Sequence, residues 1–338
     1  LCFHQIVSQT FGLSFRAKIL ELHMKYIFLI FGMIIPLLGF AHSAEDARDP
    51  LTLDGLMAAF GWDMDSAEIR LEKIDNGISV LFGLGGNIGV SIGDDGVFII
   101  DDQFPQLMPK IEQVITDLGG GDIDFAVTTH WHFDHAEGNL ALGPEGTWLV
   151  AHENSREMMK DDHLIDMVMV SYEQKAYPKS AWPDITFAES MQFHLNGQTI
   201  DLWHFGPAHT TGDTAVYFRD SNVVHLGDVY NNAGYPFIDS GNGGSLDGMI
   251  NFCSQVIQRI NKDTVVIPGH GSIADYHALV DYNDMLKLIR RRLVTLMAEG
   301  ATLDQVYAAN PTADFDEVFG SNKGFVNRAY DSLNSRVK

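Results

Sequence analysis

The chain has 338 residues, of which 22 are basic and 45 acidic, and its formal net charge at pH 7 is −23. Nucleic-acid binding needs clustered Lys and Arg to neutralise phosphates, so this acidic composition argues against a nucleic acid as partner. Of the two cysteines, Cys2 and Cys253, we expect only Cys253 to remain after N-terminal processing, which leaves no internal disulfide.

An apolar segment near the N-terminus has the features of an export signal. Lys25 precedes an apolar run over residues 26–40, and small residues follow it up to Ala44, as in secretory signal peptides. A membrane anchor is the alternative interpretation. It is disfavoured because the run contains Pro36 and is shorter than the roughly 18 apolar residues of a membrane-spanning helix.

Cleavage near Ala44 predicts a mature chain over residues 45–338, periplasmic or secreted and without a stable membrane span. Residues 24–44 are then the signal peptide, and residues 1–23 are an upstream extension that the mature protein lacks. The mature chain contains no Pro/Ser linker or low-complexity break, so we expect a single domain. The sequence leaves its oligomeric state open.

Short strands and helices alternate in the first half of the mature chain. Alternating or β-branched runs predict the strands, with Asp94-Asp95-Gly96 as a hairpin turn. Apolar positions at helical spacing predict a helix that stops at Gly119-Gly120-Gly121. The strands are expected at residues 69–73, 78–82, 88–92, 97–101, 125–129 and 147–151, and helices at 107–118 and from about 153.

The second half repeats this alternation and ends in helices. Strands are expected at residues 191–195, 199–205, 214–218, 222–226 and 264–267, and helices at 246–260, 276–299 and 302–309. Thr302 is a suitable N-cap for the last of these helices. Two halves of alternating strands and helices predict a layered α/β sandwich.

A dense group of metal-ligand residues follows the strand expected at 125–129. The segment from His130 to His135 reads His-Trp-His-Phe-Asp-His, and chance is a poor explanation for this spacing. Residues two apart in an extended segment face the same way, so His130 and His132 can share one cation. Asp134 and His135, where the chain turns, can bind a second.

Three further candidates lie at the ends of predicted strands: His209 in Ala-His-Thr, Asp228 in Gly-Asp, and His270 in Pro-Gly-His-Gly. A neighbouring glycine or proline lets the backbone turn so that each side chain can point inward. Taken singly, each is more often an ordinary hydrogen-bonded residue. Together with the group after residue 129 they predict a zinc centre, because zinc prefers neutral imidazole and carboxylate ligands.

These signatures resemble the metallo-β-lactamase superfamily over about residues 66–300, including a strand meander that ends in Asp101. The resemblance implies a four-layer αββα sandwich with two zinc ions per chain. It also implies a ligand set in which His130, His132 and His209 hold the first zinc, Asp134, His135 and His270 hold the second, and Asp228 bridges the two.

Such a centre predicts a hydrolase that attacks an acyl carbonyl with a metal-bound hydroxide, because metal ligation lowers the pKa of water from about 15.7 towards 7. Asp134 is expected to orient the nucleophile and pass on its proton. His209 is also a candidate catalytic residue, and Asn242, in a Gly-rich loop, is expected to contact a carbonyl oxygen. The expected partner is a small-molecule acyl substrate.

Two positions in or near the predicted ligand set bear on the substrate class. By resemblance, β-lactamases of the superfamily have Cys or Ser where this chain has Asp228, and one subclass has a substrate-binding Lys where this chain has Asn231. Efficient β-lactam hydrolysis is therefore not expected. A lactone, an ester or another cyclic amide fits better.

Three alternatives remain open. The ligand set is similar to that of glyoxalase II thioesterases, although the export signal and Pro268-Gly-His-Gly271 differ from that family. A di-iron redox protein of the same fold would usually have Glu at the position of His132 and an attached flavin domain. A non-catalytic zinc-binding protein is the third alternative, which chelator-sensitive hydrolysis would exclude.

Overall fold

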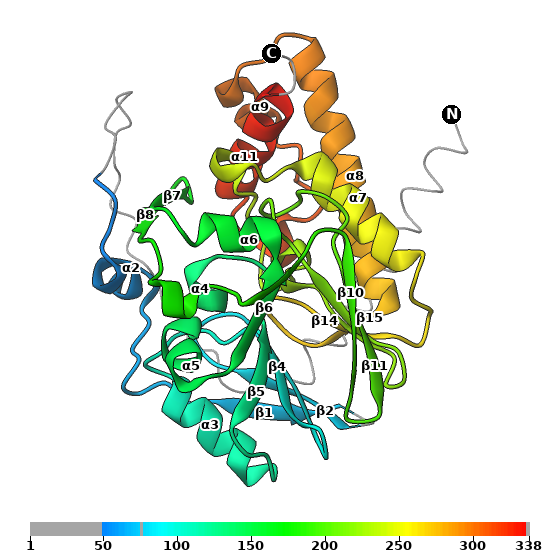
Figure 1. Cartoon of the computed structure of the whole chain (residues 1–338). Helices are drawn as coiled ribbons and strands as arrows, with labels where there is room; N and C mark the ends of the chain where they lie inside the picture. Colours follow the sequence, from blue (N-terminus) through cyan, green and yellow to red (C-terminus); the bar gives the residue numbers. More distant parts are fainter. Residues whose placement is uncertain (1–48, 75–76, 336–338) are drawn as a thin grey trace. The chain divides into compact units, whose positions relative to one another are not determined.

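The computed structural model describes residues 49–74 and 77–335 (Figure 1). The predicted upstream extension and signal peptide lie outside these residues. From Asp49 onward the chain forms one compact unit. Within the described ranges, no helix combines the length and the apolar character that crossing a membrane requires.

The first of two mixed sheets has seven strands. In spatial order they are β1 (Arg70–Lys73), β2 (Ile78–Phe82), β3 (Ile88–Gly93), β4 (Gly96–Ile100), β5 (Ile123–Val127), β6 (Trp148–His152) and β9 (Ile185–Phe187). From β1 to β4, each strand is antiparallel to the next. From β4 to β9 the strands run parallel, so β4, β5 and β6 all end at the same edge of the sheet.

The second sheet has six strands. In spatial order they are β10 (Ser190–Leu195), β11 (Gln198–Trp203), β12 (Ala215–Phe218), β13 (Val223–His225), β14 (Val265–Ile267) and β15 (Ala274–Asp275). Only β13 and β14 pair in parallel among them. A separate antiparallel hairpin joins β7 (His163–Asp166) to β8 (Ser171–Gln174).

Helices connect and cover the two sheets (Figure 1). They are α2 (Leu53–Phe60), α3 (Met108–Asp117), α4 (Phe133–Ala136), α5 (Asn139–Glu145), α6 (Glu153–Met158), α7 (Leu246–Ile257), α8 (Tyr276–Ala298), α9 (Leu303–Ala309), α10 (Asp316–Phe319) and α11 (Lys323–Asn334). Short 3-10 turns are η2 (Lys179–Ala181), η3 (Gly227–Val229) and η4 (Ser240–Asn242).

Side-chain alternation in the strands produces the layers. In β4, Val97 and Ile99 pack in one core with α3, whereas Phe98 and Ile100 pack in a second core with apolar residues of the other sheet, such as Phe218. On the outside of the second sheet, α8 contacts β14 and β15, and α7 packs against α8. The order helix, sheet, sheet, helix confirms the predicted αββα sandwich.

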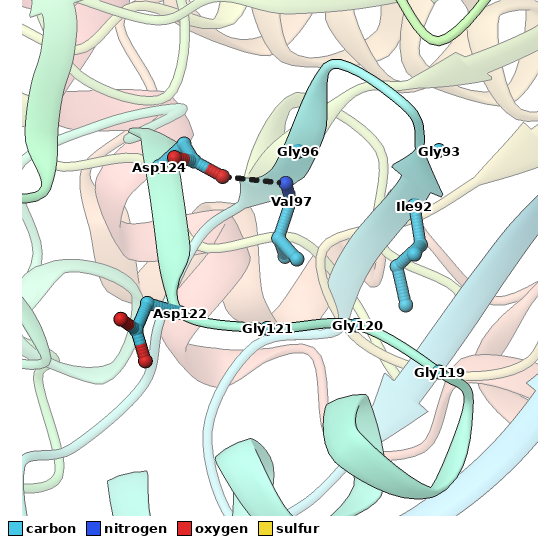
Figure 2. Close-up of a pocket in the computed structure, with 9 residues that line it drawn as sticks. All are labelled: Ile92, Gly93, Gly96, Val97, Gly119, Gly120, Gly121, Asp122 and Asp124. Atoms are coloured by element: carbon cyan, nitrogen blue, oxygen red, sulfur yellow. Dashed lines mark hydrogen bonds between the residues drawn. The ribbon is translucent and has the colours of Figure 1, made fainter.

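The strands and helices predicted from sequence are present with small shifts at their ends. Helix α3 ends before Gly119, whose φ is 93°, and the β3–β4 hairpin turns at Asp94 and Asp95. Figure 2 shows the glycine segment beside this hairpin, where the Asp124 carboxylate accepts a hydrogen bond from the Val97 amide at 2.8 Å. The hairpin β7–β8, strands β9 and β15, and helices α2, α4, α5, α10 and α11 were not predicted.

Phe98 tests the packing between the two sheets. Its side chain is buried and makes edge-to-face contacts with Phe193 and Phe218, with ring centroids 5.4 and 6.1 Å apart. We expect Phe98→Ala to lower the free energy of unfolding by about 3–5 kcal/mol in urea denaturation. The exposed Trp148→Ala, a matched control, should change it by less than about 0.5 kcal/mol. Equal losses in the two variants would contradict this packing.

Candidate metal centre

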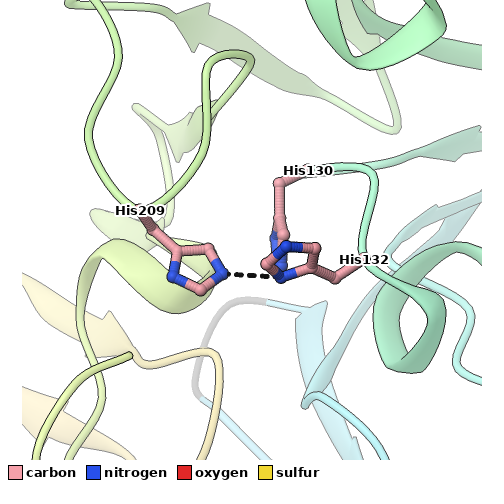
Figure 3. A group of neighbouring side chains, drawn as sticks. All are labelled: His130, His132 and His209. Carbon is pink, nitrogen blue, oxygen red and sulfur yellow. Dashed lines mark hydrogen bonds between the residues drawn. The ribbon is translucent and has the colours of Figure 1, made fainter. Parts of the chain in front are cut away.

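The predicted metal-binding residues lie in segments that follow strand ends. His130 and His132 lie between β5 and α4, and Asp134 and His135 lie in α4. Asp228 lies in η3 after β13, and His270 follows β14. The parallel pairing of β4 with β5 and of β13 with β14 gathers these strand ends at one edge of each sheet. Figure 3 shows His130 and His132, from the segment after β5, pointing toward His209, which comes from a separate segment.

All seven residues meet in one cluster. In each of three groups, the ligand atoms lie within 4.8 Å of one another and could hold a metal ion. The groups are His130 with His132 and His209, Asp134 with His135 and His270, and His130 with His135 and Asp228. Because the third group shares members with both others, two cation positions would be adjacent.

Outer hydrogen bonds fix the orientation of two rings in the first group. His209 donates from Nδ1 to the Phe237 carbonyl oxygen at 2.8 Å, and His132 donates from Nε2 to the Asp239 carboxylate at 2.9 Å. A neutral imidazole has only one N–H, so His132 Nδ1 and His209 Nε2 carry lone pairs. These two atoms face each other at 2.9 Å. Their lone pairs repel unless a cation binds them.

His130 adds a third lone pair. The Thr129 hydroxyl donates to Asp101 at 2.8 Å and therefore accepts from His130 Nδ1, which lies 3.1 Å away. His130 Nε2 is then an acceptor, and within residues 49–74 and 77–335 this buried atom has no hydrogen-bond partner. Buried polar atoms are rarely left unpaired. An unpaired nitrogen beside two converging lone pairs fits a bound metal ion.

The second group is built in the same way around a carboxylate. His135 donates from Nδ1 to Asp101 at 2.7 Å, which turns its Nε2 towards His270 Nε2 at 3.1 Å and Asp228 Oδ1 at 3.2 Å. His270 Nε2 is 3.1 Å from Asp134 Oδ2. A carboxylate behind a ligating imidazole is a common outer-shell arrangement that orients the ring and raises its basicity.

Two glycines allow this close packing. A Cβ on Gly269 would lie 2.0 Å from Asp228 Oδ1, and a Cβ on Gly86 would lie 2.1 Å from the His135 ring. Gly269, next to His270 in the chain, thus leaves space for the Asp228 carboxylate, whereas from the sequence we expected it to allow a sharp turn. Substitution at either position would displace a candidate ligand.

Burial and charge shift the pKa of the two imidazole groups in opposite directions. Burial lowers the pKa of His130 and His209, so both are neutral near pH 7. For His135 and His270 burial acts in the same direction, but neighbouring carboxylates, led by Asp228, outweigh it and raise the pKa of both. In the metal-free protein, protons therefore take the place of a cation in the second group.

Asn242, expected to contact a substrate carbonyl oxygen, has protein partners in the structure. Its side-chain amide donates to both carboxylate oxygens of Asp239, at 3.0 and 2.9 Å, and to the Leu164 carbonyl oxygen at 2.9 Å. The Asn242 amide thus donates to Asp239, and the same carboxylate accepts a hydrogen bond from His132. Asp239 was not predicted, because no local pattern marks a carboxylate that reaches a histidine 107 residues away.

A cavity of about 400 Å³ opens onto the cluster. His132, Asp134, Asp228 and His270 form its polar floor, and apolar side chains form most of its remaining lining. A substrate entering this cavity would reach the candidate metal ligands directly.

Comparison with known proteins agrees with this geometry. A family model described as "Metallo-beta-lactamase superfamily" matches residues 82–281. The crystal structure of DIM-1 metallo-beta-lactamase is 19% identical, with a TM-score of 0.53 over 65% of this chain and 97% of that one. The metallo-beta-lactamase from Pontibacter korlensis is 20% identical, with a TM-score of 0.53 over 65% of this chain and 99% of that one. At these identities the likeness concerns the fold.

A curated relative covers less of the chain. The 2,4-dinitroanisole O-demethylase subunit alpha of Nocardioides sp. (strain JS1661) is 24% identical over 103 residues. These residues are 30% of this chain and 28% of that protein. The chain therefore matches less than a third of this relative's length.

The opposite pKa shifts predict stepwise loss of metal on acidification. Protons compete for His135 and His270 near neutral pH, because their pKa is raised, and for His130 and His209 only in more acid solution. Zinc-loaded protein dialysed from about pH 8 to about pH 5 should lose metal from the second group first. Elemental analysis measures this, and His270→Ala should lack the first step. A single step at one pH would contradict the assignment.

Asp239 should act on metal affinity through His132. We expect Asp239→Asn to weaken zinc binding by about 10- to 100-fold, as loss of an outer-shell partner does. Asp263→Asn, which alters an exposed carboxylate paired with Lys262, is the matched control. Competition with a chromophoric chelator measures both affinities. Equal affinities for the two variants would show that the Asp239 contact is immaterial.

Proposed function

The chain belongs to the metallo-beta-lactamase superfamily, whose members are metal-dependent hydrolases, and we propose that it uses two zinc ions to hydrolyse a small acyl compound. The proposed ligands are the seven residues of the cluster, with Asp228 between the two ions. One observation carries the proposal: outer hydrogen bonds direct the ring-nitrogen lone pairs of His130, His132 and His209 to one point. We also propose export, on the sequence of residues 24–44.

The cluster supplies both a metal site and a proton acceptor. Divalent ions, when bound, supply Lewis acidity, which polarises a carbonyl group and makes water more acidic. Asp134 lines the cavity, and although burial opposes its ionisation, His135 and His270 lower its pKa. Its carboxylate is ionised near neutral pH and accepts a proton from water. The water oxygen then bonds to the acyl carbon, the C–O or C–N bond breaks, and the leaving group takes the proton.

The lining favours a lactone or ester over an anionic β-lactam. Asn231 lines the cavity, and its neutral amide cannot pair with a carboxylate as a Lys would. Absence of a charge-assisted contact costs roughly 1.5–3 kcal/mol. The partial likeness to an O-demethylase subunit adds an aryl methyl ether to the compounds worth assaying.

The direct test combines metal content with initial rates. We expect about two zinc ions per chain, and faster hydrolysis of an acyl-homoserine lactone or a nitrophenyl ester than of nitrocefin, a carbapenem, S-lactoylglutathione or 2,4-dinitroanisole. His132→Ala and Asp134→Ala should each lower kcat/KM by more than about a hundredfold, because a ligand matters more than its outer-shell partner. His194→Ala, a control at an exposed position of β10, should leave kcat/KM unchanged.

The outcomes separate the alternatives. Metal content that stays near one ion with zinc in excess would contradict the bridging role of Asp228. Preference for S-lactoylglutathione would identify a thioesterase, and a β-lactam kcat/KM near about 10⁶ M⁻¹s⁻¹ would identify a β-lactamase. Tight zinc binding without hydrolysis of any compound would identify a non-catalytic zinc protein.

A further inference from the structure

Segments on both sides of the matched family region form part of the cavity beside the metal cluster. The family match spans residues 82–281, whereas Phe60 and Trp62 precede it and Ser321, Gly324 and Phe325 follow it. All five line the cavity. Side chains from outside the shared fold therefore contact whatever enters this site.

These contributing side chains are held in fixed positions. Phe325 is 3% exposed and stacks on Tyr235, with ring centroids 5.3 Å apart and an interplanar angle of 3°. The Tyr235 hydroxyl donates to Asp316 at 2.8 Å. Trp62 contacts Phe104 edge to face at 5.8 Å. The aromatic walls are thus formed before any ligand binds, which lowers the entropic cost of binding.

The β7–β8 hairpin completes the wall and is tied to both flanking segments. Its Asp166 pairs with Arg328 of α11 at 3.0 Å, and the Leu51 amide, just before α2, donates to the Ser171 carbonyl oxygen at 2.8 Å. In Figure 1 the hairpin lies between α2 and α11. It contributes Met167 and the exposed Met169, and methionine side chains adapt to varied apolar shapes.

Away from the metal cluster, the lining of the cavity has no positively charged side chain. In the described chain, the lining residues include neither Lys nor Arg, and the only charged residues among them are Asp134 and Asp228, apart from any protonated histidine. The volume of about 400 Å³ suits a small organic group. A carboxylate buried among the apolar residues, away from the metal cluster, would lose its hydration without gaining a partner.

On these grounds we propose that the segment after α2, with Trp62, and helix α11, with Phe325, make the enzyme selective for substrates with an uncharged, apolar group next to the scissile bond. The inference rests on the proposed hydrolase function for its catalytic part. Trp62 and Phe325 contact the apolar group, and the metal cluster contacts the carbonyl. Because neither Lys nor Arg lines the apolar part of the cavity, an anionic group of the same size has no partner there.

The test compares probes that differ only at the end of a four-carbon acyl chain, using the zinc-loaded full chain. Turnover is measured with 4-nitrophenyl butanoate, whose acyl chain ends in a methyl group, and 4-nitrophenyl hemisuccinate, whose acyl chain ends in a carboxylate. Binding is measured by calorimetry with the corresponding neutral and anionic anilides. About 1 M salt limits the Debye length to about 3 Å and removes long-range repulsion by the acidic surface. We expect kcat/KM to be at least about tenfold higher for butanoate, and only the neutral anilide to bind.

Variants assign the selectivity to the flanking segments. Trp62→Ala should reduce the butanoate to hemisuccinate ratio by about tenfold, while Trp148→Ala, an exposed aromatic outside the cavity, should leave it unchanged. Met169→Lys, at the exposed edge of the cavity, should raise kcat/KM for the hemisuccinate.

The two proposals fail in different ways. Equal kcat/KM for the two esters, or an unchanged ratio in Trp62→Ala, would overturn the selectivity and leave the hydrolase intact. Absence of turnover together with selective binding of the neutral anilide would overturn the hydrolase and support the selectivity. Binding of both anilides, or of neither, would overturn the selectivity.

Discussion

The repulsion between converging nitrogen lone pairs is the constraint on which this molecule depends. Protein acceptors on the outer side hold the N–H groups of His132 and His209, so the inner nitrogens cannot donate to each other. Asp101 accepts the outer N–H of His135, and Thr129, which donates to Asp101, accepts the outer N–H of His130. The inner nitrogens of these two rings therefore also carry lone pairs. Such a cluster is stable only with a cation or with extra protons. The folded chain is therefore arranged to bind metal before any metal arrives.

The sandwich makes this arrangement possible. Parallel pairing places the ends of β4 and β5 beside each other in one sheet and the ends of β13 and β14 beside each other in the second. The Asn87 side chain connects them, because its amide donates to the Pro268 carbonyl oxygen at 2.8 Å and to the Gly271 carbonyl oxygen at 3.0 Å. The candidate ligands thus follow the ends of paired strands, which hold the segments that carry them in place.

Sequence reasoning succeeded where local patterns determine structure. The apolar, β-branched run over residues 97–101 predicted a strand that the structure contains as β4, and the order of the segments around His130, His209, Asp228 and His270 predicted residues that meet in space. It failed where contacts are remote. Neither Asp239 behind His132 nor Phe325 in the cavity wall carries a local signature, and no local pattern marks the hydrogen bond from Asn242 to Asp239.

The central claim is that the cluster holds two adjacent zinc ions, and anomalous diffraction at the zinc edge tests it most directly. Crystals of the chain grown with zinc should give two anomalous peaks, one among His130, His132 and His209 and one among Asp134, His135 and His270, with Asp228 in contact with both. Zinc–nitrogen distances of about 2.0–2.1 Å are expected. A single peak, or peaks outside this cluster, would contradict the account.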